Sequence, residues 1–279
     1  MNNVQLDMVL GYLNEGTEID EINFLVESLD EMVNEAFNES TMITSLLEAE
    51  DEIIDADYRE IEDEKKVGLG TKIVEAIKRF INWVKSLLAK LKNQITKLAV
   101  KSLIPKIEKN VNKQLEQLKD ADTNTEIKLN KFESAVLYQN DLVDPDKNLF
   151  ADSNTSVYSE FHKLFAKTPK FIILMSPKLA TIWNVSFTKG AKVTITIGKY
   201  IEKAKYLDEY AKLCWKNLDE AQTMYNKAIT EANKFYKEDP TEANKTIKEA
   251  TSIMNATTVI ASGSIKSILT MLKLTGRKL

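Results

Sequence analysis

The chain has few of the residues that interrupt helices or build metal sites. Its 279 residues include 8 Gly and 5 Pro, against many Lys, Glu, Leu and Ala, which favours long helices over short strands. One cysteine, Cys214, excludes an intramolecular disulfide and a multi-thiolate zinc site. One histidine, His162, excludes a site built from several histidines. The sequence therefore predicts an all-α protein, a bundle of long antiparallel helices, with no cofactor and no bound metal.

Motifs of catalysis are also missing. The sequence holds no GxxxxGK[ST] or GxGxxG pattern, and the Gly68-Leu-Gly70 stretch has no third glycine. The single His162 leaves no Ser/His/Asp triad with distinct roles, and an ordinary structural histidine is the preferred interpretation. Carboxylate pairs are frequent near the N-terminus, but acids in an exposed acidic segment keep ordinary pKa values. We expect no enzyme and no small-molecule substrate.

Targeting signals for export or membrane insertion are not evident. The chain begins Met1-Asn-Asn-Val, without the basic and apolar regions of a secretory signal peptide. No apolar run approaches the roughly 20 residues needed to span a bilayer, and the closest is 171–175 with its flanks. We expect no signal peptide and no transmembrane span.

Charge is distributed very unevenly along the chain. Residues 1–64 hold 20 acidic residues and one basic residue, Arg59, a net charge of −19, whereas the remainder holds 37 basic and 22 acidic residues, a net charge of +15. Such asymmetry suggests two parts with different partners, and an acidic tail that lies against a basic body explains it equally well. We predict an acidic, partly detached N-terminal helical arm at 1–47, an acidic linker at 48–67 and a basic helical bundle at 68–279.

The clearest pattern predicts an amphipathic helix over about 71–104. Its apolar residues step by three and four and form one stripe. The stripe comprises Ile73, Ile77, Phe80, Ile81, Val84, Leu87, Leu88, Leu91, Ile95 and Leu98. The basic residues that border it are Lys72, Lys78, Arg79, Lys85, Lys90, Lys92, Lys97 and Lys101. Packing of the stripe in a bundle core is the preferred interpretation; an anionic membrane, with Trp83 at the interface, is the alternative.

The later elements are less regular. Pro105 is expected to kink or restart the helix, and a further helix is expected over about 126–142. The segment 171–197 predicts either a buried helical or irregular apolar hairpin or a small β-hairpin, because 193–197 alternates apolar and polar residues. Long helices are expected over about 198–237 and 242–274.

An opening amphipathic element, an acidic stretch with short Leu-x-Glu sequences and a basic helical body together resemble the precursors of internal head proteins of large tailed bacteriophages. The resemblance covers only the design of about the first 65 residues and the sign of the charge after them. It implies that a prohead protease removes the N-terminal segment, cutting after a Glu that follows Leu, Ile or Ala by two residues. The matching positions are Leu46-Leu-Glu48, with a cut between Glu48 and Ala49, and Leu29-Asp-Glu31.

The leading expectation is therefore a virion structural protein, made in the host cytoplasm, whose basic body meets DNA or the inner capsid. Its implied partners are capsid or other virion proteins and DNA bound without sequence specificity. One alternative is a membrane-active protein of the ejection or pore-forming type that uses helix 71–104 on an anionic membrane. Another is a coiled-coil scaffold that uses Ile73 to Leu118.

Overall fold

The computed structural model describes residues 18–55, 63–139, 193–237, 240–277 and 279. These residues are almost wholly helical, which confirms the predicted all-α bundle. The elements are α2 (Glu18–Asp55), α3 (Asp63–Leu98), α4 (Val100–Gln117), β1 (Glu126–Leu129), α5 (Lys131–Gln139), β2 (Val193–Thr196), α8 (Ile197–Ala204), α9 (Leu207–Ala232), the 3-10 turn η2 (Phe235–Lys237) and α10 (Pro240–Gly276).

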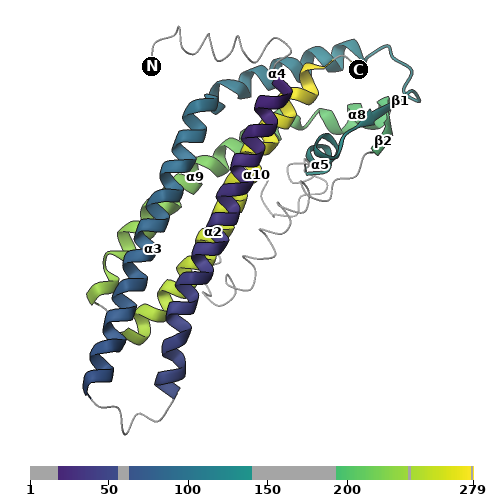
Figure 1. Ribbon diagram of the computed structural model, residues 1–279. Coiled ribbons are helices and arrows are strands. Elements are labelled where there is room, and N and C mark those ends of the chain that lie inside the picture. The colour runs from purple at the N-terminus through teal and green to yellow at the C-terminus, as the bar shows by residue number, and fades with distance from the viewer. Residues whose placement is uncertain (1–17, 56–62, 140–192, 238–239, 278) are drawn as a thin grey trace.

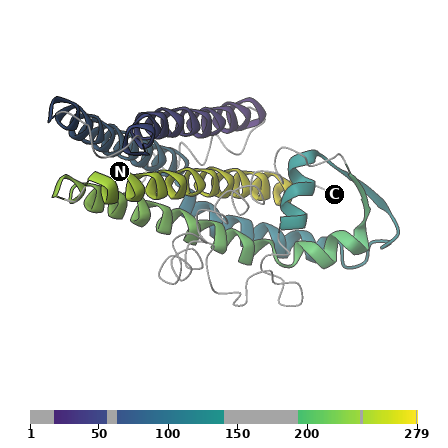
Figure 2. The same ribbon diagram turned by 90° about the horizontal axis from the view of Figure 1, so that it is seen from below.

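Four long helices, α2, α3, α9 and α10, lie side by side, and α4 turns across one end of them (Figure 1). Hydrogen bonds fix the directions: α2 runs antiparallel to α10, since Ser262 pairs with Leu29 and Asn244 with Leu47. The view from below places α10 between α2 and α9 (Figure 2). Helix α10 is thus the central helix of the bundle.

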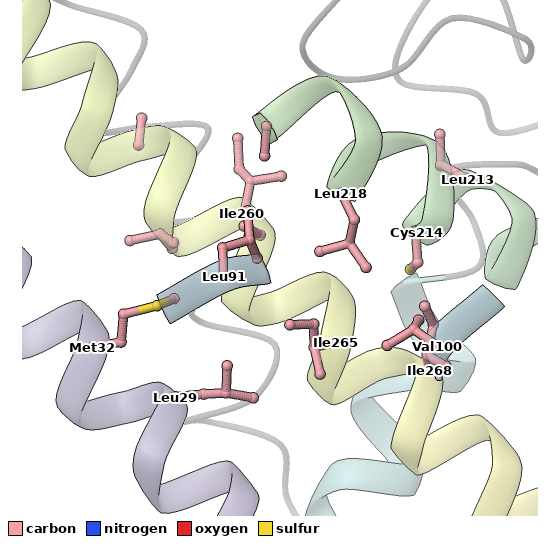
Figure 3. Packing of buried hydrophobic residues seen from close by; sticks show 14 of the residues in the cluster. Leu29, Met32, Leu91, Val100, Leu213, Cys214, Leu218, Ile260, Ile265 and Ile268 are labelled. Carbon is pink, nitrogen blue, oxygen red and sulfur yellow. The ribbon is translucent and has the colours of Figure 1, made fainter. Parts of the chain in front are cut away.

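The composition of α10 explains its central position. Between Ala250 and Leu272 its only charged residue is Lys266, and apart from Asn255 and two methionines the rest are small, hydroxylic or aliphatic. Small side chains let neighbouring helices approach, and hydroxyls can be satisfied inside the bundle. Residues 256–269 are all buried, so this stretch is enclosed on every side. Figure 3 shows Ile260, Ile265 and Ile268 of α10 meeting side chains from α2, α3, α4 and α9.

The break between α3 and α4 lies earlier than Pro105, the position expected from sequence. Helix α3 ends at Leu98, and Ala99 takes a left-handed backbone conformation with φ 43°. Pro105 is then inside α4. A proline ring clashes with the carbonyl four residues before it and supplies no N–H, which strains the helix upstream. The chain bends at Ala99, where Ser102 N–H donates to the Ala99 carbonyl at 2.7 Å.

A small sheet corrects two further expectations. Residues 126–129 begin no helix but form β1, and the helix that follows, α5, starts only at Lys131. Of the two alternatives for this region, the strand near 193 is present as β2. Its antiparallel partner is β1, with Ile127 opposite Ile195, and not a strand of a local hairpin. The 171–192 part of the expected hairpin lies outside the described residues.

The part of the acidic segment that the structure describes as α2 is not a detached arm. Helix α2 continues to Asp55 and α3 begins at Asp63, so the linker expected at 48–67 is helical at both ends, and 56–62 lie outside the description. The buried face of α2 comprises Leu29, Met32, Ala36, Ile43 and Leu47. These residues belong to the same core as α3 and α10. Burial of apolar surface, rather than mean charge, therefore decides where α2 lies.

Candidate polyanion surface

The apolar stripe of α3 faces the bundle core. Its members Ile73, Ile77, Phe80, Ile81, Val84, Leu87, Leu88 and Leu91 are buried, Ile95 is partly buried, and the side chain of Leu98 lies outside the described part. The preferred interpretation of the stripe, packing within the protein, agrees with this placement. In this conformation the described residues from Ile73 to Leu91 of the stripe contact the protein core and not a lipid surface.

The basic residues that border the stripe divide into two groups. Lys72, Lys78, Lys85, Lys92 and Lys101 are exposed, and the side chain of Lys97 lies outside the description. Lys78, Lys85 and Lys92 recur every seven residues, so they form one row along α3. Arg79 and Lys90 instead pair with carboxylates of α2. The structure therefore leaves an exposed lysine row on α3 and a second, paired group beside α2.

The paired group joins two antiparallel helices. Arg79 Nε donates to Glu39 Oε2 at 2.9 Å and Nη2 donates to Glu39 Oε1 at 3.2 Å, a two-pronged contact. Lys90, about three turns after Arg79 in α3, pairs with Glu35, about one turn before Glu39 in α2. The Glu39 carboxylate raises the pKa of Arg79, which keeps its guanidinium charged. This part of the acidic segment lies against the basic body, as the simpler interpretation of the charge asymmetry expects.

A groove of about 680 Å³ runs between α2 and α3 at these pairs. Its lining residues are Glu35, Asn38, Glu39, Glu75, Lys78, Arg79, Asn82, Trp83, Ser86, Leu87 and Lys90. Trp83 is 5% exposed and packs edge-on against Phe80, with ring centroids 5.8 Å apart. Its indole Nε1 is buried and has no hydrogen-bond partner among the described residues. The groove thus combines three cations, three carboxylates and one unused buried donor.

Sequence reasoning missed the polar contacts that fasten α10 to its neighbours. Lys266 is nearly buried and pairs with Asp30 of α2, and Asn255 Nδ2 donates to Ser40 Oγ at 2.6 Å. The one signal for the first contact was a single lysine within the apolar run of α10. A lone charge on a buried face needs a partner, but periodicity does not say which helix supplies it.

A second set of buried contacts joins α9 to α10. The hydroxyls of Tyr210 and Ser267 share a hydrogen bond of 3.1 Å, and those of Tyr225 and Thr258 share one of 2.7 Å. Burial raises the pKa of both tyrosines, and it raises the pKa of the Cys214 thiol to about 12. A thiol with such a pKa is protonated near neutral pH and is a poor nucleophile. These groups are structural contacts of the interface.

The expected processing positions lie within helix α2. Glu31 and Glu48 are both exposed, and the side chain of Ala49 is outside the described part. Proteases cleave extended backbone, so a cut between Glu48 and Ala49 requires the end of α2 to unwind first. The fragment before the cut would still carry the buried residues of α2 that the structure describes, from Leu29 to Leu47.

The described residues also bear on alternative kinds of site. No group of His, Cys, Asp and Glu side chains there could hold a metal ion. No helix among those residues combines the length and the apolar character that crossing a bilayer requires. Comparison with known proteins gives no match to a family model, to a curated protein or to a solved structure.

Proposed function

We propose that this chain is a structural protein of a phage particle, an internal head protein that contacts packaged DNA through the exposed lysine row of α3. The observation that carries the DNA contact is the placement of Lys78, Lys85 and Lys92 along one exposed side of α3, behind which the apolar stripe is buried. The phage setting rests on the resemblance of the N-terminal design alone. Capsid or other virion proteins are the further partners that this setting implies.

The lysine row suits contact with a phosphate backbone. Seven residues of α-helix rise about 10.5 Å, so the three ammonium groups are spread over about 21 Å of helix. Each lysine that neutralises a phosphate releases counterions, which supplies affinity without reading base sequence. The row is rigidly positioned because the opposite side of α3 is packed into the core. The expected binding is weakly selective and strongly dependent on salt concentration.

Replacement of the row tests the DNA contact. Binding of a fluorescent DNA duplex of arbitrary sequence would be measured by anisotropy across a salt series for the wild type and for the variant Lys78→Gln/Lys85→Gln/Lys92→Gln. We expect the slope of log K against log salt to become shallower by about 0.9 for each phosphate contact that is lost.

A matched variant controls for net charge. The variant Lys227→Gln/Lys234→Gln/Lys245→Gln removes the same charge from exposed positions elsewhere. Lys227 lies on α9, Lys234 just before η2, and Lys245 on α10. Thermal melting would show that both variants fold. The DNA-contact proposal is wrong if the two triple variants weaken binding equally, or if the wild type shows no salt-dependent binding.

The proposal also includes cleavage after Glu48. Because residues 29–47 carry the buried face of α2, we expect the released fragment to stay attached to the bundle under native conditions. Mass spectrometry of the protein from its natural source, under denaturing conditions, would show a body that starts at Ala49. Detection of the full-length chain alone would exclude this processing.

A further inference from the structure

We infer that the groove between α2 and α3 is a latent phosphate-binding site, in which Glu35 and Glu39 occupy the two cations that a nucleic-acid phosphate would otherwise meet. This inference rests on the proposed function, because it names a second site for the same class of ligand. Arg79 and Lys90 lie on the side of α3 that faces α2, beside the exposed row and not within it. Helix α2 thereby limits how many cations the protein offers to DNA.

Exposure of the paired side chains makes the exchange feasible. Arg79 is 36% and Lys90 41% exposed at the side chain, so a large partner can reach both groups. Glu39 and Glu35 are 37% and 58% exposed, so water screens both pairs. Exposed pairs of this kind contribute little to stability, and a phosphate can replace the carboxylate at low cost. Arg79 is suited to this role because its guanidinium can hold two phosphate oxygens.

The groove has further features that fit an anion with several oxygen acceptors. Lys78 of the exposed row also lines it, so the groove and the row are continuous. Ser86 and Asn82 add side-chain donors along the same wall. Trp83 also lines the groove and is 5% exposed. Its Nε1 is a buried donor without an acceptor among the described residues. Because Trp83 lines the groove, a small shift of its side chain would be needed to bring this unpaired donor to an acceptor bound there.

Two isosteric substitutions release the cations without adding a group. The test compares the wild type with Glu35→Gln/Glu39→Gln in the same DNA anisotropy assay. We expect the salt slope of the variant to steepen by roughly 1 to 2, because two more phosphates are neutralised at about 0.9 each. At low salt the affinity should rise several-fold. In the variant Trp183→Phe/Trp215→Phe, Trp83 is the only tryptophan, and its fluorescence should change when DNA binds.

The control is Glu31→Gln/Glu48→Gln. It removes the same charge from exposed positions of the same helix that have no cation partner among the described contacts. A gain for Glu35→Gln/Glu39→Gln that exceeds the gain for this control supports the latent site. Equal gains would mean that only net charge matters, and no gain would mean that the cations do not reach phosphate; either result overturns the inference.

The outcomes separate this inference from the proposed function. If the lysine-row variant loses no more binding than its matched control while Glu35→Gln/Glu39→Gln still gains, the proposed row is wrong and the groove site stands. If the row variant loses binding and the glutamate variant gains nothing, the groove site is wrong and the row stands. Inorganic phosphate provides a further readout. If phosphate reverses the change in Trp83 fluorescence that DNA causes, while DNA stays bound through the lysine row, the groove site is supported.

Discussion

Helices α10 and α3 are of nearly equal length, yet one is enclosed and the other is half exposed. Residues 256–269 of α10 are buried on all sides, whereas α3 buries one stripe and exposes lysines on its opposite face. The difference follows from spacing of charge: α10 carries one lysine between Ala250 and Leu272, but α3 carries a basic residue every few positions. Stability should therefore depend on α10, and electrostatic contact with partners on α3.

The largest effect is expected from truncation in α10. Ile265 is fully buried, so Ile265→Ala loses apolar burial and leaves a cavity, which should lower the free energy of unfolding by about 2–5 kcal/mol. Lys85→Ala on the exposed face of α3 should change it by less than about 0.5 kcal/mol. Urea unfolding of both variants measures the contrast. Similar losses in the two variants would contradict the division of roles between α10 and α3.

A smaller effect is expected from the one charge of the enclosed stretch. Asp30→Asn leaves Lys266, 7% exposed, without its carboxylate, and should destabilise the protein by about 1–3 kcal/mol, less than for a fully buried pair because Asp30 is 54% exposed. Lys266→Met removes the charge itself and should cost within about 1 kcal/mol. Chemical denaturation of both variants gives the comparison. A larger loss for Lys266→Met than for Asp30→Asn would show that the pair itself, and not the stranded charge, matters.

The smallest effect concerns the α9–α10 interface at high pH. Burial raises the pKa of Cys214 to about 12 from an ordinary 9.0, so the unfolded thiol ionises first. The protonated Cys214 thiol therefore adds to the free energy of unfolding. This contribution is complete below about pH 9 and is lost as pH rises toward 12, with a loss of about 1 kcal/mol by pH 10. Unfolding measured from pH 8 to pH 10 should therefore show a steeper decline for the wild type than for Cys214→Ala. Equal declines would mean that Cys214 does not couple folding to pH.

The helical periodicity of the sequence was enough to predict the bundle and the buried stripe of α3. It failed at 126–129, because a strand of four residues obtains its stability from β2, which lies more than sixty residues later in the chain. A local signal was present nearby: Asn130 Oδ1 accepts from the Glu133 N–H at 3.0 Å while Glu133 Oε2 accepts from the Asn130 N–H. This reciprocal cap marks the start of α5 after the strand.

The candidate site was predicted less well than the fold. The sequence identified the basic residues of α3, but it did not show that Arg79 and Lys90 pair with Glu39 and Glu35. Those pairs depend on the side-by-side packing of α2 and α3. The net charges of the two parts of the chain do not predict that packing. The acidity of the first 64 residues suggested a detached arm, although the apolar face of α2 was already visible in its spacing.

The polar contacts between α2 and α10 give this helix pair a single alignment. Apolar residues recur on each turn, so a shift of α2 by one turn could preserve much of the aliphatic packing. The bonds of Ser40 with Asn255 and of Asp30 with Lys266 exist in only one alignment, and a shift would leave the nearly buried Lys266 without its carboxylate and Asn255 Nδ2 without its acceptor. These few side chains therefore select one alignment of α2 against α10. Hydrophobic contact alone would give the neighbouring alignments nearly the same free energy.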